Sequence, residues 1–161
     1  MPSGRTHLKI ESVMLVLWAA GSTLLVLRET IAIPQALLFV GSYLFSMLLM
    51  SPDLDLSSSG AFQRWRGLRW IWLPYAWIFH HRQTSHHPLL GPLSRILYLE
   101  TLVAVVTFVY VLATGGRSPR FRLSIQMIWP ICLGLYLPNI EHILADRIST
   151  SWRRKRRRRQ L

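Results

Sequence analysis

Residues 31–55 read IAIPQALLFVGSYLFSMLLMSPDLD, an apolar run that ends in a short acidic motif. The apolar part, Ile31–Met50, matches the ~20 residues that a helix needs to cross the hydrocarbon core of a bilayer. Pro34 falls in the first turn of this run, where a helix tolerates proline. The stretch therefore predicts a membrane-spanning helix that brings Asp53 and Asp55 to one end of a bundle.

Three further apolar segments predict the other crossings. The whole chain is 51% hydrophobic and only 16% charged, which is typical of a membrane protein rather than of a soluble core. A short stretch, Trp70–Phe79, cannot span a bilayer, contains Pro74 and is rich in the aromatic rings that prefer the headgroup zone. We interpret it as an interfacial or re-entrant segment. The other crossings are Ser12–Leu27, Leu97–Thr114 and a last segment that begins near Leu123 and contains Pro130 and Pro138.

The predicted fold class is therefore all-α, a polytopic membrane helical bundle of about four transmembrane helices plus the short segment. Residues 1–150 are expected to form one domain, and residues 151–161 a basic tail.

The basic residues predict the orientation of the bundle. The net charge is +12, and much of it lies in the run Arg153–Arg159. The positive-inside rule places this tail in the cytoplasm, and about four crossings return the N-terminus, with Arg5 and Lys9, to the same side. The loop Arg117–Arg122 then falls outside, against the rule. We expect the tail to bind anionic headgroups of membrane lipids, and no aromatic or fold feature indicates nucleic-acid binding.

The stretch His80–His87 holds four of the six histidines and lies between apolar blocks. Imidazoles near lipid are costly unless something compensates them, and a metal ion does so because neutral imidazole is its commonest side-chain ligand. Neighbouring side chains point apart, so we expect His81 rather than His80, and His86 rather than His87, to be ligands. Alternatively, these histidines only contact lipid headgroups.

The predicted topology brings further candidate ligands to the same end of the bundle. His142 and Asp146 are four positions apart, so they share a helix face and can hold one ion, or they simply pair near a helix end. Asp53 and Asp55 can both face the ion if they lie in an extended loop, or they belong to a loop that flanks a helix. The predicted ligand set is His7, Asp53, Asp55, His81, His86, His142 and Asp146.

This mixture of histidines and aspartates suits a divalent metal ion, with zinc first and manganese or iron as alternatives. Three or four protein ligands would leave room for a water molecule. Glu141, about 100° from His142 around the helix, can act as a general base or support a ligand, or be only a helix-end charge. Glu100 is a second acid in an apolar segment. Four arginines near the site can hold a phosphate or a lipid headgroup, or only fix the topology: Arg64, Arg66, Arg69 and Arg82.

Several of these motifs together resemble a family of small bacterial membrane proteins known only as metal-binding, which implies a location in the bacterial inner membrane. The resemblance rests on Met1-Pro-Ser-Gly-Arg-Thr-His7, Ser51-Pro-Asp-Leu-Asp55, Arg64-Trp-Arg-Gly-Leu-Arg-Trp70 with Leu73-Pro-Tyr75, Ser85-His86 with Pro88 and Gly91, and His142 with Asp146.

The segment His81-Arg82-Gln83-Thr84-Ser85-His86 also resembles, more distantly, the His-Arg-Gly-x-Thr-His signature of membrane-bound metal-dependent hydrolases. That likeness implies a metal at His81 and His86, helped by His7 and the aspartates. The chain departs from these patterns at Gln83, at Leu8, where an acidic residue is expected, and at His87, where glycine is usual. A gapless match to the first family makes His80 the leading histidine.

The sequence thus predicts an integral membrane metal-binding protein. A metal-dependent hydrolase that acts on a lipid or phosphoester at the cytoplasmic face is the leading hypothesis. The alternatives are a metal-binding protein without catalysis and a structural protein that contacts lipid.

Overall fold

The computed structural model describes residues 4–79, 87–116 and 124–158 of the chain. Every regular element in these ranges is helical, which confirms the predicted all-α class. The elements are α1 (Gly4–Leu27), α2 (Ile33–Leu49), the 3₁₀ turn η1 (Pro52–Asp55), α3 (Gly60–Arg64), the 3₁₀ helix η2 (Arg66–Trp72), α4 (Leu73–Ile78), α5 (Leu90–Thr114) and α6 (Ile125–Arg158).

Four of these segments are long and apolar enough to cross a membrane, and they coincide with the four predicted crossings. Two boundaries differ from the prediction, because α1 begins at Gly4 rather than Ser12 and α5 begins at Leu90 rather than Leu97. Helix hydrogen bonds join backbone groups, so a helix can continue beyond the apolar part of its sequence. The four segments are Gly4–Leu27, Ile33–Asp55, Leu90–Thr114 and Ile125–Trp152.

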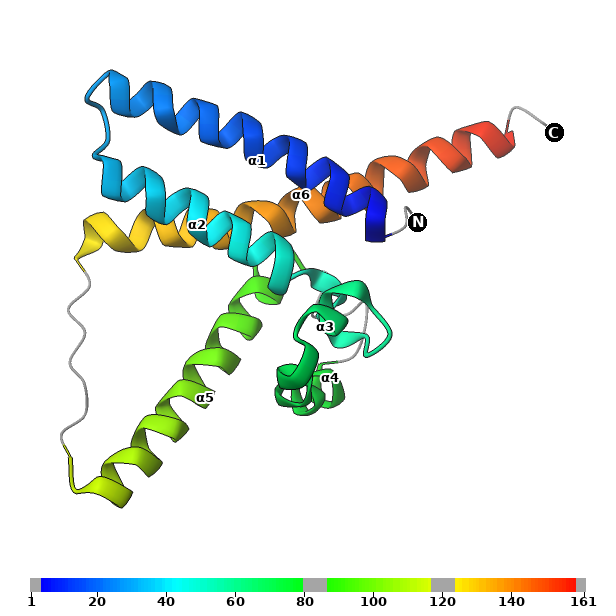
Figure 1. The fold of residues 1–161 in the computed structure, drawn as a ribbon. Coiled ribbons are helices and arrows are strands. Elements are labelled where there is room, and N and C mark those ends of the chain that lie inside the picture. The colour runs from blue at the N-terminus through cyan, green and yellow to red at the C-terminus, as the bar shows by residue number, and fades with distance from the viewer. Residues whose placement is uncertain (1–3, 80–86, 117–123, 159–161) are drawn as a thin grey trace.

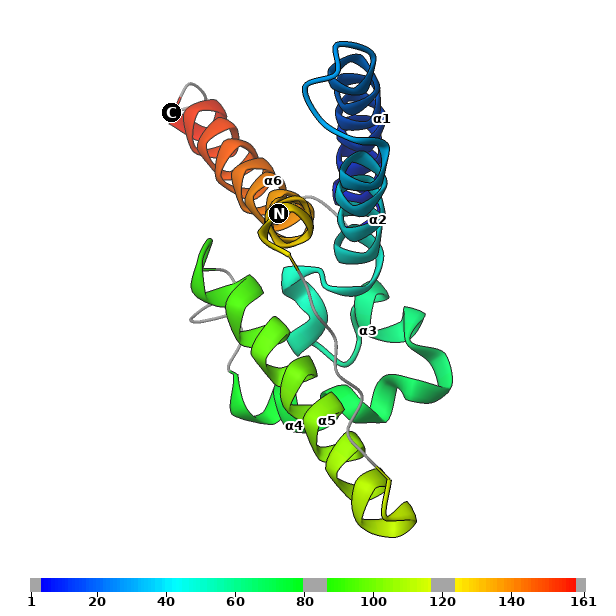
Figure 2. The ribbon, with the colours of Figure 1, turned by 90° about the vertical axis from the view of Figure 1, so that its left-hand side faces the viewer.

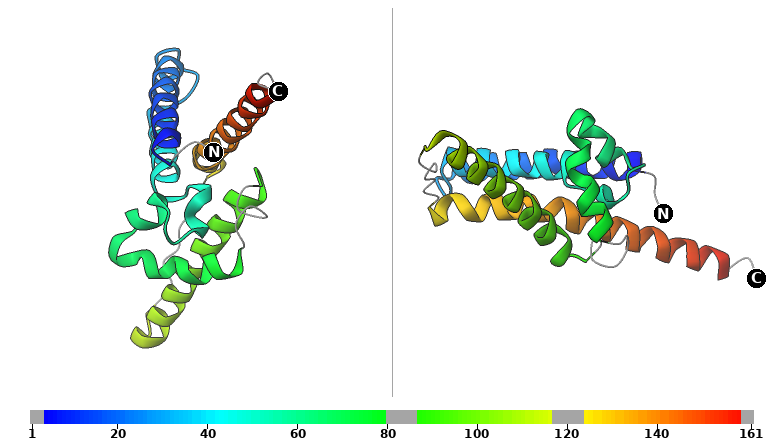
Figure 3. Two further views of the ribbon diagram at one scale, coloured as in Figure 1. Left: turned by 90° about the vertical axis from the view of Figure 1, so that its right-hand side faces the viewer. Right: turned by 90° about the horizontal axis from the view of Figure 1, so that it is seen from below.

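Helices α1, α2 and α6 form the main bundle (Figure 1). α1 and α2 make a tight hairpin, and α6 runs along α2 in the views of Figures 1 and 2. Helix α5 diverges from this group, and no residue of its apolar window is buried within the chain. The C-terminal turns of α6 project beyond the other helices, as the right panel of Figure 3 shows. The backbone of the predicted basic tail thus begins as a continuation of α6.

Helices α2 and α6 approach each other closely at Gly134. A Cβ atom added there would lie 2.1 Å from Ser42 Oγ, 2.5 Å from the carbonyl oxygen of Phe39 and 2.8 Å from the amide nitrogen of Tyr43. Two of these atoms belong to the backbone of α2, which cannot move aside cheaply. Glycine is therefore required for the two helices to touch at this point.

A buried arginine joins the start of α5 to the same pair of helices. Arg95 is fully buried, and its Nε donates to the carbonyl of Gly91 at 2.9 Å. Its Nη1 donates to Asn139 Oδ1 at 2.7 Å and to the carbonyl of Met50. Asn139 Nδ2 in turn donates to Ser46 Oγ at 3.1 Å. This network joins the end of α2 to α5 and α6.

The segment predicted to be interfacial, Trp70–Phe79, forms the end of η2 and all of α4. Trp72 and Tyr75 are fully buried in an aromatic cluster with Tyr98 of α5, whereas Trp77 is 87% exposed. The segment therefore does not cross the bundle, and two of its five rings belong to the core of the small helices.

Gly134→Ala should destabilise the fold, because the added methyl group overpacks the contact between α2 and α6. Overpacking of this kind costs about 1–3 kcal/mol, so the melting temperature should fall by about 3–10 °C. Thermal unfolding followed by tryptophan fluorescence measures the change. Gly41→Ala is the matched control, since no atom lies within 4 Å of an added Cβ at that glycine of α2. Equal melting temperatures for the two variants would contradict the conclusion that the contact between α2 and α6 requires glycine at position 134.

Candidate metal centre

The polar residues gather where the start of α1, the end of α2 and the C-terminal half of α6 meet (Figure 1). His7 comes from the second turn of α1, Asp53 from η1, and His142 and Asp146 from α6. The structure places these four candidate residues close together at one end of the bundle.

The two histidines form the centre of the site. The imidazole rings of His7 and His142 are stacked, with centroids 3.8 Å apart and planes 14° from parallel. His7 Nε2 lies 3.2 Å from Asp146 Oδ1, and His142 Nε2 lies 3.8 Å from Asp53 Oδ2. One candidate ligand atom each from His7, His142 and Asp146 lies within 4.8 Å of the other two. Two ligands bound to one zinc at tetrahedral angles are about 3.4 Å apart, which matches the separation of His7 Nε2 and Asp146 Oδ1 and is somewhat shorter than that of His142 Nε2 and Asp53 Oδ2.

Two buried atoms of this group lack a hydrogen bond to any part of the chain that the structure describes. They are His7 Nδ1 and Asp146 Oδ1. The 3.2 Å contact between His7 and Asp146 is close enough for an ion pair, but its geometry is not that of a hydrogen bond. An unsatisfied buried polar group costs about 1–3 kcal/mol, and a cation would remove that cost at the carboxylate. Neutral imidazole is also the form that binds metal ions, and two imidazolium rings stacked at this distance would repel each other.

Glu11 orients His142. Its carboxylate Oε1 lies 3.0 Å from His142 Nδ1, and both side chains are buried. An ionised carboxylate can only accept, so this contact places the proton on Nδ1 and leaves the Nε2 lone pair on the side of Asp53. A carboxylate that holds a ligating histidine in this way is the usual second layer of a metal site.

The sequence analysis missed Glu11 because it began the first helix at Ser12. With α1 extended to Gly4, His7 and Glu11 are one turn apart on the same face. The chain has Leu8 where the family resemblance suggested an acidic residue, and it supplies a carboxylate one turn later instead. The spacing of four residues between His7 and Glu11 would have indicated that both lie on one helix face.

The two aspartates of the acidic motif diverge. They lie in the 3₁₀ turn η1 rather than in the extended loop that would let both face the ion. Asp53 is near His142, and its side chain is 29% exposed. Asp55 is buried, and its charge acts on the guanidinium of Arg95. Within the described residues, Asp55 is not part of the group formed by the two histidines and Asp146.

Glu141 faces the interior of the bundle. Its two carboxylate oxygens accept from Trp18 Nε1, at 2.8 Å, and from the hydroxyl of Tyr43. The same hydroxyl lies 3.3 Å from the carbonyl of Glu11. Glu141 therefore ties α6 to α1 and α2 beside His142. The candidates His80, His81, Arg82 and His86 lie outside the described residues.

A cavity of about 560 Å³ opens at the metal centre. His7, Glu11, Asp53 and His142 line it, together with two arginines, Arg5 and Arg64.

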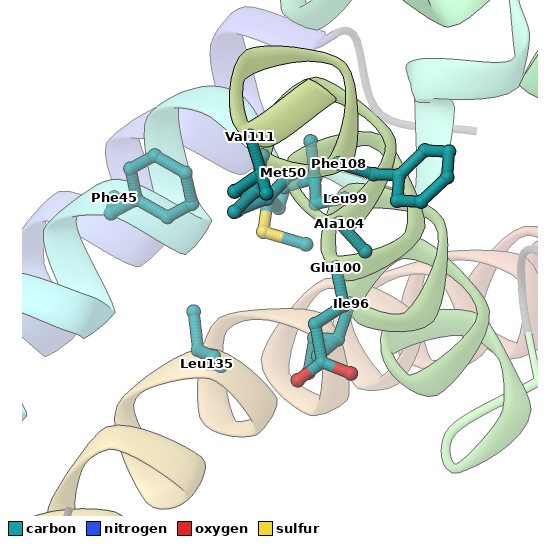
Figure 4. Close-up of a pocket in the computed structure, with 11 residues that line it drawn as sticks. Phe45, Met50, Ile96, Leu99, Glu100, Ala104, Phe108, Val111 and Leu135 are labelled. Atoms are coloured by element: carbon teal, nitrogen blue, oxygen red, sulfur yellow. The ribbon is translucent and has the colours of Figure 1, made fainter. Parts of the chain in front are cut away.

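Glu100 lies elsewhere, in an apolar groove of about 670 Å³ between α2, α5 and α6 (Figure 4). It is an exposed residue of α5, and the side chains around it in Figure 4 are apolar, among them Phe45, Ile96 and Phe108. Glu100 is therefore not a member of the metal centre.

Clustered buried imidazoles and carboxylates on a helical scaffold define a class, the helical metal-binding proteins. The comparison with known families agrees, because residues 2–156 match the family described as "Uncharacterized metal-binding protein (DUF2227)". The chain belongs to this family, and its membership supports metal binding.

A curated relative described as "Uncharacterized protein", from Aquifex aeolicus (strain VF5), is 45% identical over 58 residues. That match covers 35% of this chain and 40% of the relative. No solved structure matches the chain.

Glu11→Gln should weaken metal binding about 10- to 100-fold. The amide oxygen still accepts from His142, but it lacks the negative charge that raises the basicity of the His142 imidazole. A competition titration against a chelator of known affinity measures the dissociation constant. Glu29→Gln, in the hairpin at the other end of α1, is the matched control and should bind the metal as the unmodified protein does. An unchanged dissociation constant for Glu11→Gln would remove Glu11 from the centre.

Proposed function

We propose that this chain is an integral membrane metalloprotein that hydrolyses an ester or phosphoester bond of a lipid at the cytoplasmic face. The observation that carries the proposal is the group His7, His142 and Asp146, whose candidate ligand atoms lie within 4.8 Å of one another. Two buried atoms of the same group lack a hydrogen bond among the described residues, which favours a bound cation.

Membrane insertion is supported by the surface of the bundle. Large apolar side chains of α5 are widely exposed, for example Val106 at 67% and Leu112 at 68%. Soluble monomers rarely expose contiguous apolar faces of this extent. We place the metal centre on the cytoplasmic side, because the start of α1 and the basic end of α6 lie at that end of the bundle.

The part of the chain that the structure describes offers three candidate ligands, His7, His142 and Asp146, and Asp53 is positioned to become a fourth. A divalent cation bound there, zinc first or manganese or iron, would supply Lewis acidity and make a water molecule easier to deprotonate. Glu11 would hold His142 in the ligating tautomer. Glu141 was expected to act as a general base, but both of its oxygens accept hydrogen bonds in the bundle. We therefore assign it to holding α6 in place rather than to proton transfer.

A second candidate function is a metal site without catalysis. His7, Asp53 and His142 come from three separate elements, so one ion would fasten α1, η1 and α6 together. Metal binding would then act mainly through folding stability.

His142→Ala should lose most of its metal, because it removes the histidine closest to both His7 and Asp53. Elemental analysis of the purified protein should find about one ion per unmodified chain. His87→Ala is the control, since this exposed histidine accepts from the backbone at the start of α5, with its Nδ1 3.1 Å from Leu90 N, and is not in the group formed by His7, His142 and Asp146. Full metal content in His142→Ala would refute the proposed centre.

Turnover separates the two candidate functions. A hydrolase should cleave bis(p-nitrophenyl) phosphate or p-nitrophenyl esters when metal is present and should stop when a chelator removes it. The site without catalysis predicts a lower melting temperature after chelation and no turnover of either substrate.

A further inference from the structure

Two arginines share the cavity of the metal centre. Arg5 reaches it from the first turn of α1 and Arg64 from the end of α3, and both line the same 560 Å³ as His7 and His142. Neither arginine serves as a metal ligand, since guanidinium donates only. Besides offsetting the carboxylates of the cavity, their N–H groups are suited to donate to an anion.

Arg64 is held in place by the end of α2. Its Nη1 donates to the carbonyl of Leu48 at 2.9 Å, and the side chain is half-buried. A guanidinium carries five N–H donors in a fixed plane, and this bond uses one of them. The charge of Arg64 also acts on Glu11, which places the guanidinium within electrostatic reach of the metal centre.

Because of the charges around the cavity, its affinity for anions depends on whether a metal ion is bound. The two carboxylates that line the cavity, Glu11 and Asp53, balance the charges of Arg5 and Arg64. Asp146, which lies beside His7 but does not line the cavity, adds a further negative charge, so the ionised site without a cation repels anions. A divalent cation reverses that balance. A tetrahedral anion with several acceptor oxygens would then meet a cation on one side and guanidinium donors on the other.

We infer that the cavity binds a phosphate group, with Arg5 and Arg64 as its donors beside the metal. The inference rests on the proposed metal centre and narrows the substrate class from esters in general to phosphoesters. Free phosphate compounds and phospholipid headgroups present the same chemistry, and the test below separates these two sources.

The test is calorimetric titration of the metal-loaded protein with inorganic phosphate, with metal content measured on every sample. Arg5→Gln and Arg64→Gln should each weaken phosphate binding about tenfold or more at unchanged metal content. Chelation should weaken binding of phosphate to the unmodified protein by at least as much. Arg69→Gln is the matched control, because Arg69 is exposed, donates to Gln63 Oε1 at 3.1 Å and does not line the cavity.

Arg64→Lys covers the case in which Arg64→Gln fails to fold, since lysine keeps the charge and loses the planar set of donors. It should retain metal and bind phosphate less tightly than the unmodified protein. A parallel titration with dihexanoyl phosphatidic acid distinguishes the sources. Tighter binding of this lipid, with the same dependence on Arg5 and Arg64, indicates a headgroup, and equal binding indicates a free phosphate compound.

Two results overturn the inference in distinguishable ways. A protein that carries metal but binds phosphate equally well in Arg5→Gln, Arg64→Gln and Arg69→Gln would overturn the phosphate site alone. A protein that binds no metal would overturn the proposed function and, with it, this inference.

Discussion

The close contact between α2 and α6 at Gly134 is the constraint on which the rest of the structure depends. Because a side chain at that position would meet the α2 backbone, glycine lets the two helices approach closely. Their approach puts Asn139 within 3.1 Å of Ser46 and therefore within reach of Arg95. One turn further along α6, the same alignment brings His142 to the aspartate that follows α2.

Helix α6 carries polar groups on two faces, and each face has a separate role. Asn139, His142 and Asp146 follow one another at helical spacing and meet the start of α5, η1 and α1. Glu141 points towards Trp18 and Tyr43 instead. Every one of these groups is engaged on a neighbouring element, so the polar side chains of α6 determine how the bundle assembles as well as what it binds.

The sequence predicted the helical class, the four long apolar segments and the position of His142 and Asp146 on one face of a helix, because these follow from hydrophobic runs and from helix periodicity. It also predicted that His7 and Asp53 would reach the same end, which follows from counting crossings. It could not place Arg95 or Glu11, since their partners are set by packing between elements distant in the chain. The extended loop expected around Asp55 was wrong, because the sequence of four residues does not by itself distinguish a loop from a short turn. The 3₁₀ turn η1 that forms instead points the two aspartates in different directions.

The position of the metal centre explains how such a polar group can persist beside apolar helices. Buried carboxylates and imidazoles are costly in the middle of an apolar bundle, and here they lie at its end, where a cavity admits water and ions. The centre is nevertheless dry at its core, with His7 and His142 only 4% and 3% exposed. A dry core strengthens the attraction between a cation and its ligands, and an open cavity lets ions reach them from outside. Burial and access thus come from the same location, the junction of the start of α1, the end of α2 and the middle of α6.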